Sequence, residues 1–285
     1  MIDMEFKDKF IGFVDILGWK ELVKAAEAGT GMTLSTLIEV AKELGTPEDR
    51  DRYEKHGPRI CRNSACTQRD LGFRLTQISD CVIVSSEISP AGIINLVDHC
   101  WGAVIELLTK GIMCRGYITR GSVYHTDTEI IGSGYHEALD KEAQVTAFKN
   151  DADERGTPFV EVDPVICNYV RDCGDQCVKK MFSRYVKEDG KVTALFPFKR
   201  LQHSFIIAGF GHTCNPEEEK RSNENLRRRI EKFKVRVMAL VDLSNSNAVI
   251  KAEHYVKALD AQLEECNKSD EMIDMLSSFP PKRTN

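Results

Sequence analysis

The sequence predicts an α+β fold, on the basis of three stretches in its first half. Residues 10–17 are almost wholly apolar, as in a strand that is buried on both faces of a sheet. Residues 73–85 form two β-rich runs that meet at Ser79-Asp80, which is the pattern of a tight hairpin. Residues 89–110 carry apolar side chains at spacings of three and four, which predicts one long helix.

The composition indicates an ordinary globular protein. The chain of 285 residues is 42% hydrophobic and 29% charged, and its net charge of -5 gives no general affinity for nucleic acid or anionic membranes. We find no apolar run of the roughly 18 residues that a membrane helix needs, and no signal-peptide pattern at the start. We therefore expect a cytoplasmic protein.

The ten cysteines are expected to be reduced thiols in that compartment. Cys61 and Cys66 form one loose pair, and Cys173 and Cys177 form another. Neither pair has the two-residue spacing of a zinc knuckle, so we do not expect zinc.

The other predicted elements follow along the chain. A helix begins after Gly18, and the polar residues 45–66, with Pro47 and Pro58 as breakers, are predicted to form a loop. Arg115 lies inside a predicted strand, where a buried guanidinium needs an anionic partner. The further predicted elements are a helix at 33–44, a long strand at 112–124, a strand, glycine turn and helix at 129–142, and strands at 159–163, 192–198 and 205–208.

The region from Pro216 onward is highly charged and carries two apolar stripes separated by residues 244–247. This pattern predicts a helical hairpin that packs on the main body or on a second subunit. We therefore divide the chain into a main domain of residues 1–215, a helical hairpin of residues 216–276 and a disordered tail of residues 277–285.

Asp15 and Asp80 are the leading candidates for a functional site. Asp15 interrupts the apolar strand, where an ionised carboxylate needs a compensating partner, and Asp80 lies at the tip of the hairpin. If the hairpin pairs beside the strand, the two carboxylates converge and raise each other's pKa unless a divalent cation binds between them. Hard oxygen ligands suit Mg²⁺ or Mn²⁺, often together with substrate phosphates. The structural alternative is that each aspartate is merely a helix cap or a turn residue.

A helix N-terminus follows Asp15 almost at once, and its free backbone N–H groups are a natural site for phosphate. Three segments then carry a resemblance to a known family: Phe-Val-Asp-Ile-Leu-Gly at 13–18, Ile-Ser-Asp-Cys at 78–81 and Arg-Gly-Tyr-Ile-Thr-Arg-Gly at 115–121. In their order they resemble the catalytic domain of class III nucleotide cyclases, and most closely the bacterial Pycsar pyrimidine cyclases. Those enzymes make cyclic UMP or cyclic CMP in antiphage defence.

The resemblance covers roughly residues 8–165. It implies a ferredoxin-like βαββαβ core with a C-terminal helical extension, in a head-to-tail homodimer whose active sites lie between the subunits. The implied product is a second messenger that a separate cyclic-nucleotide-gated effector would read.

The resemblance also implies roles for individual residues. It assigns two Mn²⁺ or Mg²⁺ ions per site to Asp15, Asp80 and the backbone carbonyl of Ile16. One cation would lower the pKa of the ribose 3′-OH, which attacks the α-phosphorus and expels pyrophosphate. Either Arg115 or Arg120 would supply positive charge at the leaving group. The implied contacts to the substrate on the strand and helix start are Phe13, Leu17, Gly18 and Trp19.

Two departures from the purine cyclases concern the base and the transition state. Purine cyclases carry an Asn and an Arg on the helix after the glycine turn, where this chain has His136 and Asp140. They also carry a base-reading Lys four residues before the second metal Asp, where this chain has Thr76. An adenylate or guanylate cyclase is therefore disfavoured, although it stays an alternative.

Pyrimidine recognition has its own candidate residues. Arg74 and Thr76 share a strand face with Asp80 and could donate to a pyrimidine oxygen. Cytosine presents an amino donor, which Asp127 or Gln77 could accept. We expect UTP to be favoured over CTP.

Two further alternatives stay open. A polymerase of the diguanylate-cyclase type would need a Gly-Gly-(Asp/Glu)-(Glu/Asp)-Phe hairpin, whereas this hairpin reads Ile-Ser-Asp-Cys. A catalytically silent, nucleotide-sensing module of the same fold would have no need of two metal carboxylates.

Overall fold

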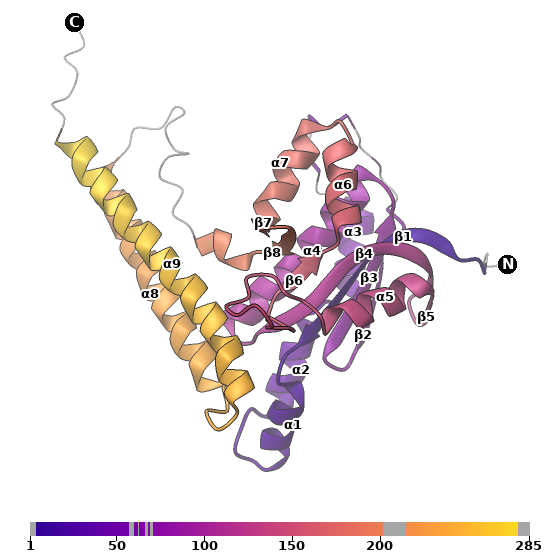
Figure 1. Cartoon of the computed structure of the whole chain (residues 1–285), viewed down its shortest axis with the longest axis horizontal. Coiled ribbons are helices and arrows are strands. Elements are labelled where there is room, and N and C mark those ends of the chain that lie inside the picture. Colours follow the sequence, from indigo (N-terminus) through magenta and orange to yellow (C-terminus); the bar gives the residue numbers. More distant parts are fainter. Residues whose placement is uncertain are drawn as a thin grey trace, which may run out of the picture.

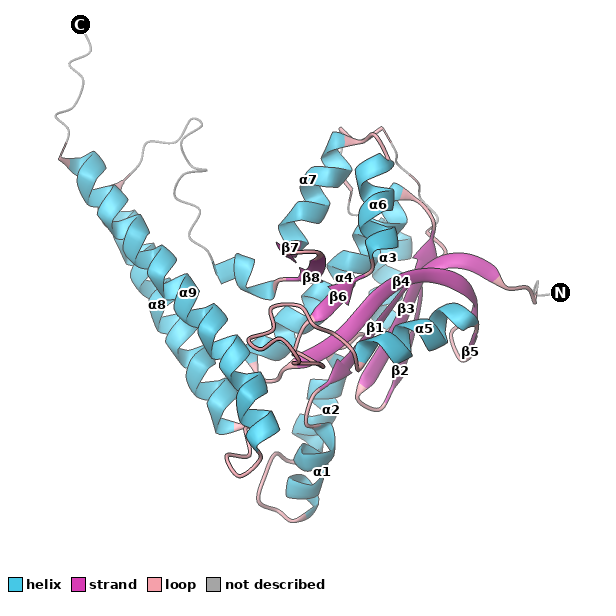
Figure 2. Cartoon of the chain, in the orientation of Figure 1, coloured by secondary structure: helices cyan, strands magenta, loops and turns pink. Residues whose placement is uncertain are grey.

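The computed structural model describes residues 4–56, 60–61, 63–65, 68, 71–201 and 215–278. Within these residues, eight strands form one sheet that is combined with helices, so the protein has an α+β fold (Figures 1 and 2). The strands are β1 (Lys7–Ile16), β2 (Arg74–Ile78), β3 (Cys81–Glu87), β4 (Cys114–His125), β5 (Ile130–Ile131), β6 (Val160–Val162), β7 (Val186–Asp189) and β8 (Val192–Leu195). The helices are α1 (Trp19–Glu27), α2 (Leu34–Lys42), α3 (Pro47–His56), α4 (Pro90–Thr109), α5 (Ser133–Glu142), α6 (Pro164–Asp172), α7 (Gln176–Tyr185), the short 3₁₀ helix η1 (Pro197–Leu201), α8 (Pro216–Ala239) and α9 (Ser246–Ser277).

The strand β1 lies inside the sheet, whose order is β2-β3-β1-β4-β6-β8-β7. It pairs antiparallel with β3 on one side and with β4 on the other. Gly116 permits the close approach of β4, because a Cβ at this position would lie 2.1 Å from the Phe13 carbonyl oxygen. The apolar run at residues 10–17 is therefore a buried inner strand, as the sequence predicts.

The two faces of the sheet are covered differently. Phe10, Val14 and Ile16 of β1 belong to the main core, which β1 shares with α4, α6 and α7. Ile11 and Phe13 point to the opposite face and join a smaller cluster that includes residues of α5. By strand alternation, Asp15 lies on this second face.

The helix α4 forms the centre of the main core. Ser89 caps it through the Gly92 N–H at 3.0 Å, and Pro90 occupies its first turn, as the sequence predicts. Its length and hydropathy would suit a membrane span, but 78% of its apolar window is buried inside the protein. The apolar character of α4 is therefore that of a helix in the core of the domain.

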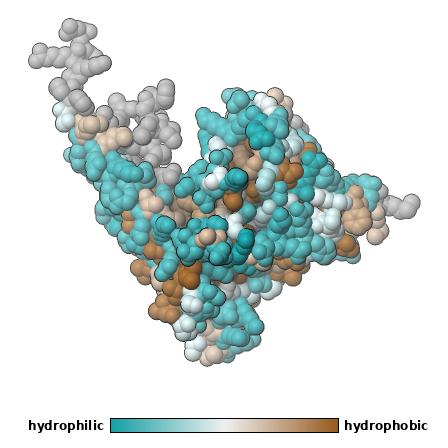
Figure 3. Space-filling view, viewed as in Figure 1, coloured by the Kyte–Doolittle hydropathy of each residue, from teal (hydrophilic) through white to brown (hydrophobic). Residues whose placement is uncertain are grey.

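The helices α8 and α9 lie side by side as a long antiparallel pair that projects from the end of the sheet (Figure 1). Ion pairs join them along their length, such as Lys234 Nζ to Asp260 Oδ1 at 2.8 Å. A second hydrophobic cluster attaches them to the main body, and Tyr255 is its largest fully buried side chain. In the space-filling view, apolar side chains gather where the end of this pair comes down beside α1 (Figure 3).

Several sequence-based predictions differ from the structure. A loop was expected over residues 45–66, yet α3 occupies Pro47–His56. Pro47 begins this helix instead of breaking a pattern, and Asp49 accepts a hydrogen bond from the Thr46 N–H at 2.9 Å. The helices α6 and α7 and the strand β7 were not predicted. The strand expected at residues 205–208 lies outside the described residues, as does the tail beyond residue 278, whereas residue 277 belongs to α9.

Candidate metal site

The hairpin formed by β2 and β3 brings Asp80 to Asp15. In the register of β1 and β3, Asp15 is opposite Cys81, and the Ile16 N–H donates to the Asp80 carbonyl at 2.9 Å. Burial raises the pKa of Asp15 to about 7, with further contributions from the negative charges of Asp80 and Glu142. The predicted pairing of hairpin and strand is therefore confirmed, and the two carboxylates lie close enough to interact.

The turn at the tip of the hairpin explains how Asp80 is presented. Ile78 pairs with Cys81, so that Ser79 and Asp80 are the two connecting residues. Ser79 adopts a φ of 55°, in the left-handed region that non-glycine residues seldom occupy. Ser79 is exposed and Asp80 is half-buried at this tip.

Arg115 and Glu142 form a buried ion pair beside the two aspartates. Arg115 is opposite Asp15 in the register of β1 and β4, and its Nε donates to the Glu142 carboxylate. The two side chains are only 17% and 8% exposed. The anionic partner expected for Arg115 is thus Glu142, the last residue of α5. Nothing in the sequence pattern singled out Glu142, which is a third carboxylate near Asp15.

The junction between β1 and α1 offers backbone donors next to this cluster. Gly18 adopts a φ of 76° as the N-terminal cap, without a side-chain hydrogen bond to the helix. The first N–H groups of α1, which begins at Trp19, therefore have no partner within the helix. The Leu17 N–H, in contrast, donates to the Met113 carbonyl at 3.0 Å. The predicted role of Leu17 as an amide donor thus conflicts with the geometry, whereas Gly18 and Trp19 fit it.

Two other candidate residues are engaged in contacts of their own. Arg120 points to the opposite face of β4, where its Nε and Nη2 donate to Asp8 at 3.0 and 2.7 Å. The structure therefore does not bring Arg120 to Asp15 within one chain. Phe13 shares a face with Asp15, but its ring is packed in the cluster beneath α5 and is 4% exposed.

The candidates for reading the base form a second cluster on the same face of the sheet. Arg74 Nε lies 3.9 Å from the Asp127 carboxylate. The Thr76 hydroxyl hydrogen-bonds His125 Nε2 at 3.0 Å, and His125 Nδ1 hydrogen-bonds the Ser85 hydroxyl at 2.8 Å. Burial lowers the pKa of His125 to about 3, with support from the positive charges of Lys9 and Arg74. His125 is therefore neutral, and it holds the Thr76 hydroxyl in an internal network.

The donor set restricts the kind of metal site. Among the residues that the structure describes, no three or more His, Cys, Asp or Glu side chains are arranged to hold a metal ion. A cation at Asp15 and Asp80 would need backbone carbonyls, water or substrate phosphates as further ligands, which Mg²⁺ and Mn²⁺ accept. The Cys61 and Cys177 thiols are hydrogen-bonded to each other, whereas Cys66 lies outside the described residues.

Comparison with known proteins adds no assignment. No protein-family model matches the chain, and no curated protein is significantly similar to it. The function is therefore argued from the residues and their geometry.

Proposed function

We propose that the chain is a metal-dependent nucleotide cyclase that acts on a pyrimidine nucleoside triphosphate, with UTP favoured over CTP. The observation that carries this proposal is the pair of Asp15 and Asp80 carboxylates beside the start of α1. The elements β1, α1, β2, β3, α4 and β4, with the strand order β2-β3-β1-β4, support a ferredoxin-like βαββαβ core. This is the core that the sequence motifs imply for a class III nucleotide cyclase.

The pKa of Asp15 supports a cation between the carboxylates. The raised pKa means that an ionised Asp15, which is partly buried and faces the negative charge of Asp80, is unfavourable when nothing neutralises it, and a divalent cation reverses that preference. Asp15 and Asp80, together with the Ile16 carbonyl, would hold two Mn²⁺ or Mg²⁺ ions. These ions would acidify the ribose 3′-OH and neutralise charge on the phosphates.

The proposed reaction is an in-line displacement. The 3′ oxygen loses its proton to solvent and forms a bond to the α-phosphorus, while the bond from that phosphorus to the β-phosphate bridging oxygen breaks. The products are the 3′,5′-cyclic monophosphate and pyrophosphate. The Gly18 and Trp19 amides would bind the phosphates of the substrate and of this leaving group.

Neither Arg115 nor Arg120 has the role of a direct contact to the leaving group within one chain. Arg115 is committed to Glu142, so it would act by holding Glu142 and by lowering the pKa of Asp15, and not as a free contact to pyrophosphate. Arg120 could reach a site only in another subunit. A head-to-tail homodimer, in which Arg74, Thr76 and Asp127 of one protomer meet the aspartates of its partner, is part of the proposal.

The cellular role in the proposal follows from the sequence motifs alone. The enzyme would work in the cytoplasm of a bacterium, and its product would be a second messenger in antiphage defence. A separate cyclic-nucleotide-gated effector would read that product.

The decisive experiment incubates the purified protein with ATP, GTP, CTP or UTP and Mn²⁺, and identifies cyclic products by mass spectrometry. We expect cyclic UMP as the main product, with none from Asp15→Asn or Asp80→Asn and full activity in Asp172→Asn, a control at an exposed aspartate at the end of α6. A main product of cyclic AMP or cyclic GMP would refute the pyrimidine assignment. Undiminished turnover in either aspartate variant would refute the metal site.

One observation favours a second candidate, a catalytically silent module that senses a nucleotide. Arg115 is paired with Glu142, and Arg120 with Asp8, so neither predicted arginine is directed at the aspartates of its own chain. Binding of a nucleoside triphosphate in the presence of Mn²⁺, without any cyclic product, would establish this candidate instead.

A further inference from the structure

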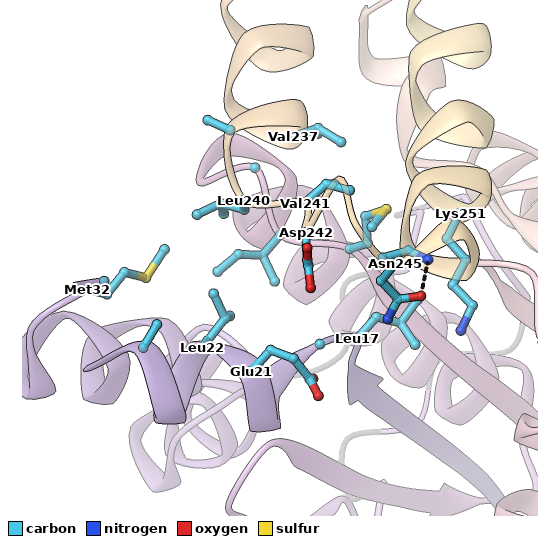
Figure 4. A pocket seen from close by; sticks show the side chains of 18 of the residues that line it. Leu17, Glu21, Leu22, Met32, Val237, Leu240, Val241, Asp242, Asn245 and Lys251 are labelled. Carbon is cyan, nitrogen blue, oxygen red and sulfur yellow. Dashed lines mark hydrogen bonds between the residues drawn. The ribbon is translucent and has the colours of Figure 1, made fainter. Parts of the chain in front are cut away.

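A cleft of ≈ 560 Å³ lies between the start of α1 and the turn that joins α8 to α9 (Figure 4). One wall comes from the junction of β1 and α1, including Leu17, Gly18 and Glu21. The opposite wall comes from the α8–α9 turn and the first turns of α9. The cleft therefore begins at the backbone donors that adjoin the candidate metal site.

The two ends of the cleft differ in chemistry. Leu22, Met32, Leu240 and Val241 make one end apolar. The other end has polar residues of the turn and of α9, namely Asp242, Asn245, Asn247 and Lys251. Asn245 and Lys251 of this end lie on the side of Leu17 (Figure 4).

Lys251 lines this cleft and interacts electrostatically with the residues of the candidate metal site. Burial lowers its pKa, and Arg115 lowers it further, whereas the negative charges of Glu142 and Asp15 oppose this effect. Its ammonium group has no hydrogen bond or ion pair within the part of the chain that the structure describes. Lys251 thus brings a half-buried amino group into the wall of the cleft, near enough to Asp15 and Glu142 to interact with them.

The acidic residues of the cleft limit where an anion can bind. Glu21 and Asp242 project from opposite walls (Figure 4), and hydrogen bonds from Ser244 lower the pKa of Asp242. Repulsion from these carboxylates leaves the region between Gly18 and Lys251 as the favourable one for phosphate. An ammonium group binds phosphate as a compact point charge, and the uncapped start of α1 adds backbone donors there.

We propose that this cleft binds the phosphate chain of the nucleoside triphosphate and that Lys251 is a substrate contact supplied by the C-terminal helices. The inference rests on the proposed function for the identity of the substrate. It assigns to the α8–α9 pair a part in the site, in addition to its packing against the sheet. Binding of a triphosphate would therefore tie α9 to the start of α1.

The test measures binding by calorimetry, with inorganic tripolyphosphate and with UTP as probes, each in the presence of Mn²⁺. Lys251→Met removes the charge and keeps most of the side-chain length. Lys268→Met is the matched control, because Lys268 is exposed on the same helix and pairs with Glu265 at 2.7 Å, far from the cleft lining. Lys251→Arg tests whether a positive charge alone restores binding.

We expect Lys251→Met to weaken the binding of both probes by about tenfold or more, which is the usual effect of losing a charge-assisted contact. Lys268→Met should bind like the wild type, and Lys251→Arg should recover part of the affinity. Thermal unfolding of each variant without ligand shows that the fold is retained. Equal affinities for Lys251→Met and Lys268→Met would overturn the inference.

The outcome also separates this inference from the proposed function. Tripolyphosphate binding that depends on Lys251, in a protein that makes no cyclic nucleotide, would support the phosphate cleft and refute the cyclase. If Lys251→Met made cyclic nucleotide as fast as the wild type at low substrate concentration, the cyclase proposal would be supported. The proposed role of the cleft in binding phosphate would then be refuted.

Discussion

Replacing Asp15 with asparagine should stabilise the metal-free protein above neutral pH. The substitution removes a carboxylate that is partly buried and lies near the negative charges of Asp80 and Glu142, and it preserves the size of the side chain. The native pKa of about 7 lies above the ordinary value of 3.8, so the native state retains a proton that the unfolded state has released. The wild type should therefore lose stability as the pH rises from about 4 to about 7, and the whole penalty is present above that range.

The magnitude follows from the same pKa. A tenfold change in proton affinity corresponds to about 1.4 kcal/mol, so the ionised carboxylate would cost at most about 4 kcal/mol. Asp15 is only half-buried, and water screens part of that cost, so we expect about 2 kcal/mol.

Urea unfolding of the wild type, Asp15→Asn and the exposed control Asp140→Asn measures this effect. The free energy of unfolding of Asp15→Asn should exceed that of the wild type by the largest amount near about pH 8 and by a smaller amount near about pH 5. Added Mn²⁺ should stabilise the wild type at about pH 8 and should have little effect on Asp15→Asn, because a ligand stabilises only a state that binds it. If Asp15→Asn and the wild type were equally stable at both pH values, neither burial nor the neighbouring negative charges would be destabilising the ionised Asp15 carboxylate.

Other substitutions test the surroundings of the site, and unfolding by urea measures all of them. Tyr255→Ala should cost about 3–5 kcal/mol by opening a cavity under α9, whereas Tyr255→Phe, which loses only the contact from the Cys114 N–H, should cost about 1 kcal/mol. Arg115→Ala should cost about 3–5 kcal/mol because it leaves Glu142 buried and unpaired, and the double variant with Glu142→Gln should recover much of that loss. His125 has a native pKa of about 3, below its ordinary value of 6.5. The unfolded state therefore binds a proton more readily than the native state below about pH 6.5. Lowering the pH to about 5 should reduce the free energy of unfolding by about 2 kcal/mol. A His125→Gln variant that kept the same pH dependence as the wild type would contradict this.

The elements that were predictable from the sequence have strong, continuous patterns. The apolar run of β1, the two β-rich runs around Asp80 and the apolar stripe of α4 each give one preferred structure. The elements that were missed are short or mixed in pattern. Pro47 was interpreted as a breaker although it begins α3, and the helices α6 and α7 span only Pro164–Asp172 and Gln176–Tyr185.

The sequence predicted only those residues of the candidate site that neighbouring strands bring together. Asp15 lies near the end of β1 and Asp80 lies in the turn just before β3, and because β1 pairs with β3, the position of each aspartate indicates the other. Glu142 and Lys251 reach the site through the packing of α5 and α9, which no local pattern encodes. Likewise, the use of the Leu17 N–H by the Met113 carbonyl depends on how the end of β1 meets the start of β4.

The inner position of β1 has a consequence for how the protein acquires its shape. β1 leaves the ribosome before both of its partners, β3 and β4, have been synthesised. Contacts between segments so distant in sequence form slowly, and an unpaired apolar strand is prone to aggregation while it waits. Nascent chains that stop before β4 should therefore bind chaperones and expose residues 10–17 to proteases, and protection should begin only after residue 125 has emerged.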